Sequence, residues 1–375
     1  MSVPKICVIT AARSEYGLLR WLIDELNLDK DIELQLVVTG AHLSNQFGYT
    51  IDEIVSDGYP IAAKVDMELK VDSTANIAKS MGLCGIRFAE VFKDLNPDII
   101  VVLGDRYELL PICSTAIIMN IPIAHISGGD VTEGAIDDQI RNAVSMMSAI
   151  HFPGVEDSSE NLSRMCGSEN IFVVGEPGLE NFKRLKLMNR EMLSQSLGLD
   201  FHKQWVLVTQ HPETKLTIDL NLDIIHNLIN GLKALKSFEF IITKANADPG
   251  GNEINQYFES ICNEDKHFKL FSSLGQLRYL SLINEVAFVI GNSSSGIVEA
   301  PFCGTPVINI GNRQKGRYIS SNIINVSGFD DSITDAINIL VARKNDKILV
   351  KDNYYGDGNT AIKIKNIIKT FLKNE

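Results

Sequence analysis

Four side chains of the sequence could transfer protons, and three of them closely follow short apolar runs. Asp105, Asp130 and Asp137 lie in the first half of the chain, and His211 lies in the second. Carboxylates that gather at one place raise one another's pKa, which suits proton transfer near neutral pH. The three aspartates together therefore predict acid/base chemistry, although Asp105 alone could equally be paired with an arginine for structural reasons.

A second group of residues could bind a phosphate. The stretch 291–301 follows an apolar run and reads Gly-Asn-Ser-Ser-Ser-Gly-Ile-Val-Glu-Ala-Pro. Small hydroxyl and glycine residues ahead of a helix offer backbone N–H groups, hydroxyls and a helix dipole to an anion. Glu299, near the start of that helix, could hold a ribose diol. The alternative is that the serines only cap the helix.

Arginines close to these positions could neutralise a diphosphate. Arg13 stands at the start of an expected helix after the first apolar run, and Arg313 and Arg317 lie in a short basic loop. Arg141 follows Asp137 by four residues and shares its helix face. The alternatives are a solvated Arg13 and an ordinary surface ion pair between Asp137 and Arg141.

No cofactor or metal motif accompanies these groups. Residues 11–17, after the first apolar run, do not form the G-x-G-x-x-G dinucleotide fingerprint, so NAD is not expected. The sequence has no Walker lysine loop and no pair of histidines four residues apart with a carboxylate. We therefore expect neither a cofactor nor a metal.

Apolar runs separated by helical patterns predict the elements that would position these groups. Such runs indicate parallel strands covered by helices on both faces, and ligands bind beyond the carboxyl ends of strands of this kind. We expect strands at residues 5–10, 32–38, 99–103, 123–126, 150–152 and 171–174, and again at 205–209, 238–242, 268–271, 286–290 and 306–310.

A break at residues 175–178 separates the two series of strands. The expected fold is therefore α/β, with two Rossmann-like domains and a ligand cleft between them. We expect a first domain of residues 1–176, on which a last helix within 360–375 packs back, and a second, anion-binding domain of residues 177–359. A length of 375 residues agrees with two domains.

Composition limits the class of partner. The net charge of −12 argues against broad binding to nucleic acid or to anionic membranes. No apolar run approaches the roughly 18 residues of a membrane helix, and we see no signal peptide before the first strand. The six scattered cysteines indicate reduced thiols. We therefore expect a cytoplasmic protein that binds neither nucleic acid nor membrane.

Taken in order, these motifs resemble the UDP-N-acetylglucosamine 2-epimerase family over essentially the whole chain, and most closely the hydrolysing branch of sialic-acid biosynthesis. The stretches that carry the resemblance are residues 10–17, 38–42, 103–108, 125–130 with Asp137 and Asp138, 291–301 and 313–317. The family implies a glycosyltransferase-B-like fold, UDP binding by the second domain, a UDP-sugar substrate and a homodimer.

The resemblance also implies roles for single residues. The UDP- and substrate-binding set would be Arg13, His42, Arg141, Ser293, Ser294, Glu299, Arg313 and Arg317. The residues at acid/base positions would be Asp105, Asp137 and His211. One position departs from the family, because many members carry a glutamate where this chain has Ser127. Asp130 is the nearest carboxylate and our candidate replacement.

The reaction implied by the resemblance produces N-acetylmannosamine and UDP for sialic-acid-type surface polysaccharide. The C2 proton leaves together with UDP by anti-elimination, giving a 2-acetamidoglucal. Water then adds at C1 while C2 is reprotonated on the opposite face. The alternatives are UDP-N,N'-diacetylbacillosamine as substrate for legionaminic acid, a non-hydrolysing epimerase, a glycosyltransferase on the same fold, and a catalytically silent sugar-nucleotide sensor.

Overall fold

The computed structural model of the chain describes residues 3–131, 136–213, 215–245, 250–343 and 352–374. The chain divides into two compact units, which are described separately. Unit 1 comprises Met1–Asn181 and Gly356–Glu375, and unit 2 comprises Phe182–Tyr355. The first division lies a few residues beyond the predicted 176, and the chain returns to unit 1 a few residues before the predicted helix.

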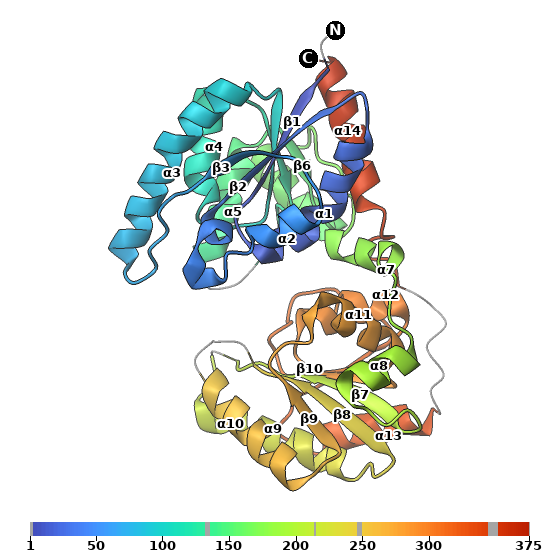
Figure 1. Cartoon of the computed structure of the whole chain (residues 1–375). Coiled ribbons are helices and arrows are strands. Elements are labelled where there is room, and N and C mark those ends of the chain that lie inside the picture. Colours follow the sequence, from blue (N-terminus) through green and yellow to red (C-terminus); the bar gives the residue numbers. More distant parts are fainter. Residues whose placement is uncertain (1–2, 132–135, 214, 246–249, 344–351, 375) are drawn as a thin grey trace. The chain divides into compact units, whose positions relative to one another are not determined.

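Unit 1 is built on a six-stranded parallel sheet with the order β3-β2-β1-β4-β5-β6 (Figure 1). Its strands are β1 (Lys5–Thr10), β2 (Glu33–Thr39), β3 (Ile61–Val65), β4 (Ile99–Leu103), β5 (Ile123–Ile126) and β6 (Ile150–Phe152). All residues of β4, β5 and β6 are buried. Helices on both faces of the sheet explain why these strands appear as unbroken apolar runs.

Two hydrophobic cores cover the two faces of this sheet. The helices of unit 1 that precede unit 2 in the chain are α1 (Arg13–Leu28), α2 (Ile51–Ser56), α3 (Thr74–Leu95), α4 (Leu109–Ile118), α5 (Ile136–Met147) and α6 (Glu156–Cys166). Tyr16 and Leu19 of α1 pack in one core, whereas Phe88 of α3, Ile112 of α4 and Ile140 of α5 pack in the other. The three helices α3, α4 and α5 therefore share one face.

The last helix, α14 (Thr360–Asn374), belongs to unit 1 although it follows unit 2 in the chain. Figure 1 shows α14 in red beside α1 in blue. Ile364 and Ile368 are buried in the same core as α1. Lys365 Nζ also lies 2.7 Å from Glu25 Oε2, and Lys369 Nζ lies 2.8 Å from Asp29 Oδ2.

Unit 2 repeats the architecture with the strand order β12-β11-β10-β7-β8-β9, again all parallel. Its strands are β7 (Gln204–Thr209), β8 (Phe238–Thr243), β9 (Phe268–Phe271), β10 (Phe288–Gly291), β11 (Val307–Ile310) and β12 (Ile323–Val326). Its helices are α8 (Arg190–Leu197), α9 (Ile218–Lys233), α10 (Gly251–Glu264), α11 (Gly275–Glu285), α12 (Glu299–Cys303) and α13 (Ser332–Ala342), while the short α7 (Asn181–Arg184) spans the boundary. The predicted α/β fold with two Rossmann-like halves is thus confirmed.

Two strands were not predicted, and one predicted strand is wrong. Residues 171–174 do not form a strand, because the only pairing there is an isolated bridge between His151 and Ile171. The unpredicted strands β3 and β12 lie at sheet edges. Each strand has only one fully buried residue and at least one exposed residue, so neither appears as a continuous apolar run.

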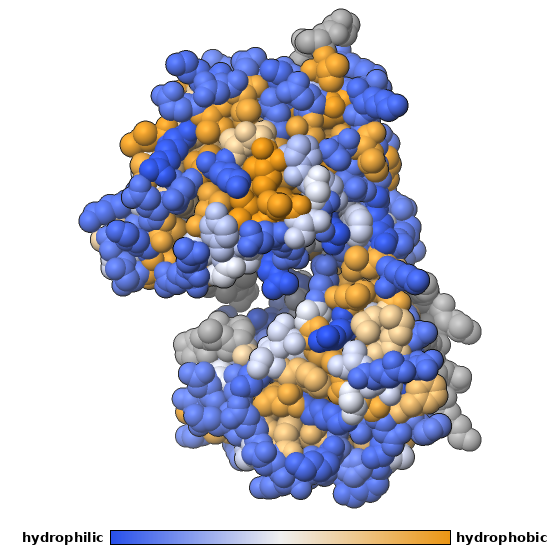
Figure 2. All heavy atoms as spheres, viewed as in Figure 1, coloured by the Kyte–Doolittle hydropathy of each residue, from blue (hydrophilic) through white to orange (hydrophobic). Residues whose placement is uncertain are grey.

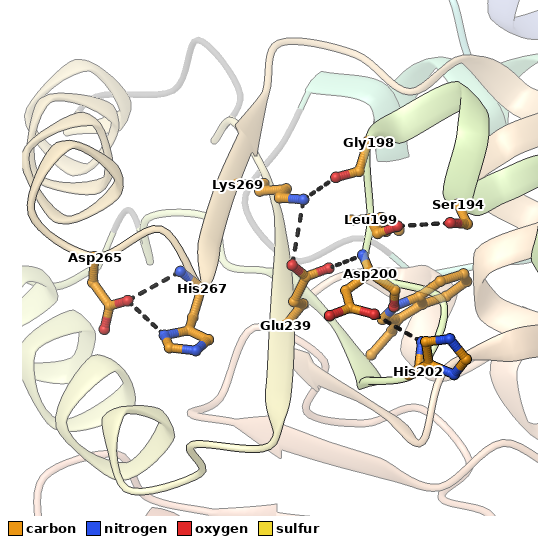
Figure 3. Close-up of polar contacts among 10 residues, drawn as sticks. Ser194, Gly198, Leu199, Asp200, His202, Glu239, Asp265, His267 and Lys269 are labelled. Carbon is orange, nitrogen blue, oxygen red and sulfur yellow. Dashed lines mark hydrogen bonds and ion pairs between the residues drawn. The ribbon is translucent and has the colours of Figure 1, made fainter.

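A polar network fixes the amino ends of β8 and β9 in unit 2 (Figure 3). Glu239 of β8 accepts a hydrogen bond of 2.7 Å from the Asp200 N–H and lies 3.4 Å from Lys269 Nζ of β9. Lys269 also contacts the Gly198 carbonyl. These contacts lie at the amino ends of the strands, whereas ligands of parallel sheets bind beyond the carboxyl ends. We therefore interpret the network as structural.

On the face shown in Figure 2, hydrophilic residues cover most of each unit, and hydrophobic residues are exposed in smaller areas. Among the described helices, none combines the length and the apolar character that a membrane span requires.

Candidate functional site

A cavity of about 910 Å³ lies at the carboxyl ends of the strands of unit 1. Asp105 and Arg106, just beyond β4, line the cavity together with Glu15 from the first turn of α1 and Asp137 from the first turn of α5. Asp137 is exposed, and 29% of the Asp105 side chain is exposed. The structure thus brings together two of the four predicted acid/base residues at one accessible place.

Arg141 organises the polar side of this region. Its side chain is buried and forms an ion pair with Asp105. Its Nη1 donates to Asp138 Oδ1 at 2.9 Å and to the Asp130 carbonyl at 2.8 Å. The surface pair between Asp137 and Arg141 is therefore not the arrangement found. Arg141 instead fixes Asp105 to α5 and to the loop after β5.

Asp130 is not among the residues that line the cavity. Its Oδ1 accepts a hydrogen bond of 2.6 Å from Ser158 of α6. The two glycines before it allow other parts of unit 1 to pack closely against the loop. A Cβ on Gly129 would lie 2.2 Å from the Ser158 carbonyl, and a Cβ on Gly128 would lie 2.9 Å from His125 Nδ1. Asp130 thus contributes to positioning the loop, and its role as the replacement for the missing glutamate stays a prediction.

Three charged residues that were not predicted as site residues contact one another, and two of them line the cavity with Asp105. Glu108 is fully buried and accepts a 2.7 Å hydrogen bond from Arg106 Nη2. Glu15 is also buried, and its Oε2 accepts from the N–H groups of Ala11 and Ala12 at 2.7 and 3.1 Å. Glu15 Oε1 lies 3.9 Å from Arg106 Nε. Two buried carboxylates therefore flank one guanidinium at the cavity wall.

Burial decides the protonation of groups around this site. Burial raises the pKa of Glu15 from its ordinary 4.5 to about 7, although hydrogen bonds from the backbone and the Arg106 charge oppose it. Burial also lowers the pKa of the His125 imidazole to about 4. His125 is therefore neutral at pH 7, with Nε2 donating to the Gly104 carbonyl at 2.8 Å and Nδ1 lying 3.0 Å from Ser145 Oγ. It ties β5 to the end of β4.

Two predicted ligand-binding residues of unit 1 have other surroundings. His42 is fully buried, with Nε2 3.0 Å from Thr10 Oγ1 and Nδ1 2.8 Å from Thr50 Oγ1. Burial lowers its pKa to about 4, so the imidazole is neutral at pH 7, and its two contacts hold the loop after β2 in place. Arg13 is largely exposed and pairs with Glu53 at 2.9 Å, and it does not line the cavity.

In unit 2, the loops that follow β7, β10 and β11 are joined through one asparagine. The Asn292 side chain accepts from the His211 N–H and donates to the His211 carbonyl, each at 2.8 Å. The Asn292 carbonyl accepts from Gln314 Nε2 at 2.9 Å and from Arg313 Nη1 at 3.3 Å. Asn292 thus links the loops that carry His211 and Arg313 at the carboxyl ends of the strands.

The predicted phosphate cradle consists of a tight turn and a short helix. A 3-10 turn (Ser294–Gly296) follows β10, and α12, which begins at Glu299, is five residues long. Ser293 caps the turn, and its Oγ lies 2.9 Å from Ser295 Oγ, which in turn lies 2.5 Å from the Tyr279 hydroxyl. Ser294 is exposed. The middle serine is therefore the hydroxyl most accessible to a ligand.

Charge near the cradle is of both signs. Glu299 is half-buried at the start of α12, and burial raises its pKa while the charge of Arg317 opposes that shift.

Within the described residues, no cluster of three histidine, cysteine or acidic side chains is arranged to hold a metal ion.

Comparison with known proteins identifies the family. Residues 24–369 match the family of UDP-N-acetylglucosamine 2-epimerases. The chain is 42% identical over 326 residues, 86% of this chain and 84% of the relative, to the hydrolysing GDP/UDP-N,N'-diacetylbacillosamine 2-epimerase of Campylobacter jejuni. It is 34% identical over 374 residues, 99% of this chain and 95% of the relative, to polysialic acid biosynthesis protein P7 of Escherichia coli. The chain therefore belongs to the UDP-N-acetylglucosamine 2-epimerase family, and these relatives support its hydrolysing branch.

Solved structures agree on the fold. The UDP-N-acetylglucosamine 2-epimerase of Neisseria meningitidis, whose crystal structure contains UDP-N-acetylglucosamine, superposes with a TM-score of 0.77 at 19% identity. The match covers 98% of this chain and 100% of that one. The glycosyltransferase-B-like fold with two Rossmann-like units that the resemblance implied is thus confirmed.

Proposed function

We propose that this protein is a hydrolysing 2-epimerase of a UDP-linked 2-acetamido sugar, and that it releases UDP and the free sugar epimerised at C2. The observation that carries the proposal is the cavity shared by Asp105 and Asp137, with Asp105 fixed by the buried Arg141. Two carboxylates on one cavity can remove a proton from one face of a carbon and return one to the other face. A glycosyltransferase would not need such a pair.

The nucleotide end of the substrate would bind to unit 2. Ser294 offers an exposed hydroxyl, and Arg313 and Arg317 provide positive charge on the loop after β11. Glu299 would accept hydrogen bonds from the ribose diol. Positive charge and hydroxyls around the diphosphate stabilise the negative charge that develops on UDP as it leaves, which lowers the barrier to elimination.

The sugar end would bind to the cavity of unit 1. The C2 proton of a 2-acetamido sugar is barely acidic, so its removal must accompany departure of UDP. Asp105 and Asp137 provide the base for this step and the acid that reprotonates C2 of the 2-acetamidoglucal, while water adds at C1. His211 lies at the carboxyl edge of unit 2, and its predicted acid/base role would be exerted on the departing UDP.

Two sugars fit this chemistry. Our sequence prediction is UDP-N-acetylglucosamine, which would give N-acetylmannosamine for sialic-acid-type surface polysaccharide, and the relationship to protein P7 supports it. UDP-N,N'-diacetylbacillosamine is the second candidate, and the 42% identical relative supports it. The predicted cytoplasmic location and homodimer belong to the proposal as well.

The test uses each UDP-sugar in deuterated water. We expect UDP and a free mannose-configured sugar that carries one deuterium at C2. Nuclear magnetic resonance identifies both products and the position of the deuterium. Deuterated UDP-sugar epimer without free sugar would instead show the non-hydrolysing reaction. Binding of UDP without turnover of either substrate would favour a sugar-nucleotide sensor.

A further inference from the structure

Glu213 is a buried acidic residue to which the proposed function gives no role. It follows β7 in the same loop as His211 and is 9% exposed. Its backbone is tied to α9, because its N–H donates to Asn221 Oδ1 at 2.8 Å and its carbonyl accepts from Asn221 Nδ2 at 3.2 Å. Burying an acidic side chain costs free energy unless hydrogen bonds replace those lost to water. The groups that contact its carboxyl oxygens therefore indicate what it does.

The carboxyl group of Glu213 contacts the start of the basic loop, which comprises residues 311–317 after β11. Its Oε1 accepts a 2.9 Å hydrogen bond from the Asn312 N–H, although the two residues are 99 positions apart in the chain. Gly311 makes this contact possible, because a Cβ at that position would overlap Oε1. Gly311 also has a φ of +77°, which glycine adopts at little cost. The Glu213 side chain thus occupies space that a side chain on Gly311 would need.

The rest of the basic loop is built on the backbone at Asn312. The Lys315 N–H donates to the Asn312 carbonyl at 3.0 Å, and the Arg317 N–H donates to the Gln314 carbonyl at 3.2 Å. Gln314 is buried, whereas Arg313, Lys315 and Arg317 are exposed. A displacement of the backbone at Asn312 would therefore move all three cations of the loop.

Glu213 does not itself suit a phosphate. A carboxylate repels a nearby anion, so it would weaken UDP binding unless it contributed something that outweighs the repulsion. The hydrogen bond to the Asn312 N–H is such a contribution, because a loop that is ordered before its ligand arrives loses less entropy on binding. We propose that Glu213 is a positioning residue of the UDP site, which holds the basic loop in its anion-binding conformation through this hydrogen bond. The inference rests on the proposed function, in which the arginines of the loop bind the diphosphate.

Two substitutions of Glu213 separate the hydrogen bond from the rest of the side chain. Glu213→Met roughly keeps the length of the side chain but removes the acceptor, and it should raise the Kd of UDP at least about tenfold, or about 1.4 kcal/mol. Glu213→Gln keeps an oxygen that can accept from the Asn312 N–H, and its Kd should stay within about threefold of the wild type. Titration calorimetry on the whole chain measures both values.

Glu239→Met is the matched control for a general loss of stability. Glu239 is also buried in unit 2 and also accepts a hydrogen bond from a distant backbone N–H, that of Asp200, at 2.7 Å (Figure 3). This contact lies at the amino ends of the strands, away from the basic loop. The control should therefore lower the free energy of unfolding but leave the Kd of UDP within about threefold of the wild type.

Hydrogen exchange read by mass spectrometry shows whether the loop is held before UDP binds, and it needs no variant. In the free wild type, amides of residues 312–317 should already exchange slowly, and UDP should slow them little further. In Glu213→Met the same amides should exchange faster in the free protein and regain their protection with UDP. Fast exchange in the free wild type would overturn the inference, since the ligand alone would then order the loop.

The affinities for UDP decide between the remaining outcomes. An unchanged Kd in Glu213→Met would overturn the inference, and so would an equal loss in Glu213→Gln, because the hydrogen bond would then not be the cause. An equal loss in Glu239→Met would overturn it too, since destabilisation of unit 2 would explain the effect. Each of these results leaves the proposed function intact if the wild type releases free sugar. If the wild type bound no UDP, the proposed function itself would fail, and this inference with it.

Discussion

At the scale of single residues, Asp105 and Asp138 provide a matched comparison. Both carboxylates contact Arg141, and their side chains are 29% and 28% exposed. Only Asp105 lines the cavity. A role in chemistry can therefore be separated from a role in holding Arg141.

We expect Asp105→Asn to lower turnover at least about a hundredfold, because a general acid or base contributes on this scale. Affinity for UDP should stay within about tenfold, or about 1.4 kcal/mol. Asp138→Asn should keep most of the activity. Turnover and UDP binding by titration calorimetry decide the matter. Equal loss of turnover in both variants would mean that the aspartates act by positioning Arg141.

Glu15 gives a residue-scale prediction on pH. Its pKa is raised by burial to about 7 from the ordinary 4.5. Between these values the folded state binds a proton that the unfolded chain releases, so the contribution of Glu15 to stability is present below about pH 4.5 and is lost as pH rises to about 7. The shift corresponds to about 3 kcal/mol.

Glu15→Gln removes this titration, because its amide is neutral at every pH. The free energy of unfolding of the variant, relative to the wild type, should therefore rise as pH increases from about 5 to about 8. Urea unfolding at several pH values measures it. A difference between the two proteins that is constant with pH would show that Glu15 is ionised throughout.

At the scale of elements, strands with both faces covered are predictable and edge strands are not. β4 and β7 end beside Asp105 and His211, and their apolar runs marked these ends correctly. β3 exposes Ala62 and Lys64, so its pattern carries no such run.

The residues of the candidate site also fall into those that the sequence pattern reveals and those that it does not. Asp105 and Asp137 were predictable because a carboxylate after a strand or in the first turn of a helix is visible in the sequence. Glu15 and Glu108 were not, because their burial depends on segments distant in the chain. The burial of His42 was not predictable for the same reason, since the threonines that contact its ring lie 32 and 8 residues away in the chain.

The turn after β10 carries the element-scale prediction. Ser294 is exposed on this turn, whereas Ser295 is buried and bound to Ser293 and Tyr279. Ser294→Ala should weaken UDP binding by about 1 kcal/mol without changing stability. Ser295→Ala should lower the free energy of unfolding by about 1–3 kcal/mol, because it leaves the Tyr279 hydroxyl without this partner. Calorimetry and thermal unfolding separate the two effects. UDP affinity unchanged in Ser294→Ala would remove this turn from the nucleotide site.

At the scale of the whole molecule, unit 1 is made from both ends of the chain. α14 supplies Ile364 and Ile368 to its core, and the Ala361 N–H donates to Glu180 Oε2 at 2.8 Å. The residues of unit 2 are therefore synthesised before unit 1 can be complete. An activity that depends on Asp105 and Asp137 should depend on this last helix as well, although no residue of α14 lines the cavity.

Ile368→Ala tests this dependence. Deleting a fully buried aliphatic side chain costs about 2–5 kcal/mol, and the exposed Asn366→Ala on the same helix is the control. Hydrogen exchange read by mass spectrometry should show faster exchange of amides in β1 and β4 of unit 1, because α14 helps to hold that unit folded. Amides in β7 and β8 of unit 2 should be unchanged if the two units unfold separately, and should accelerate equally if they unfold as one. Unchanged exchange in β1 would contradict the assignment of α14 to the core of unit 1, because Ile368 belongs to the same hydrophobic core as Ile6 and Val8 of β1.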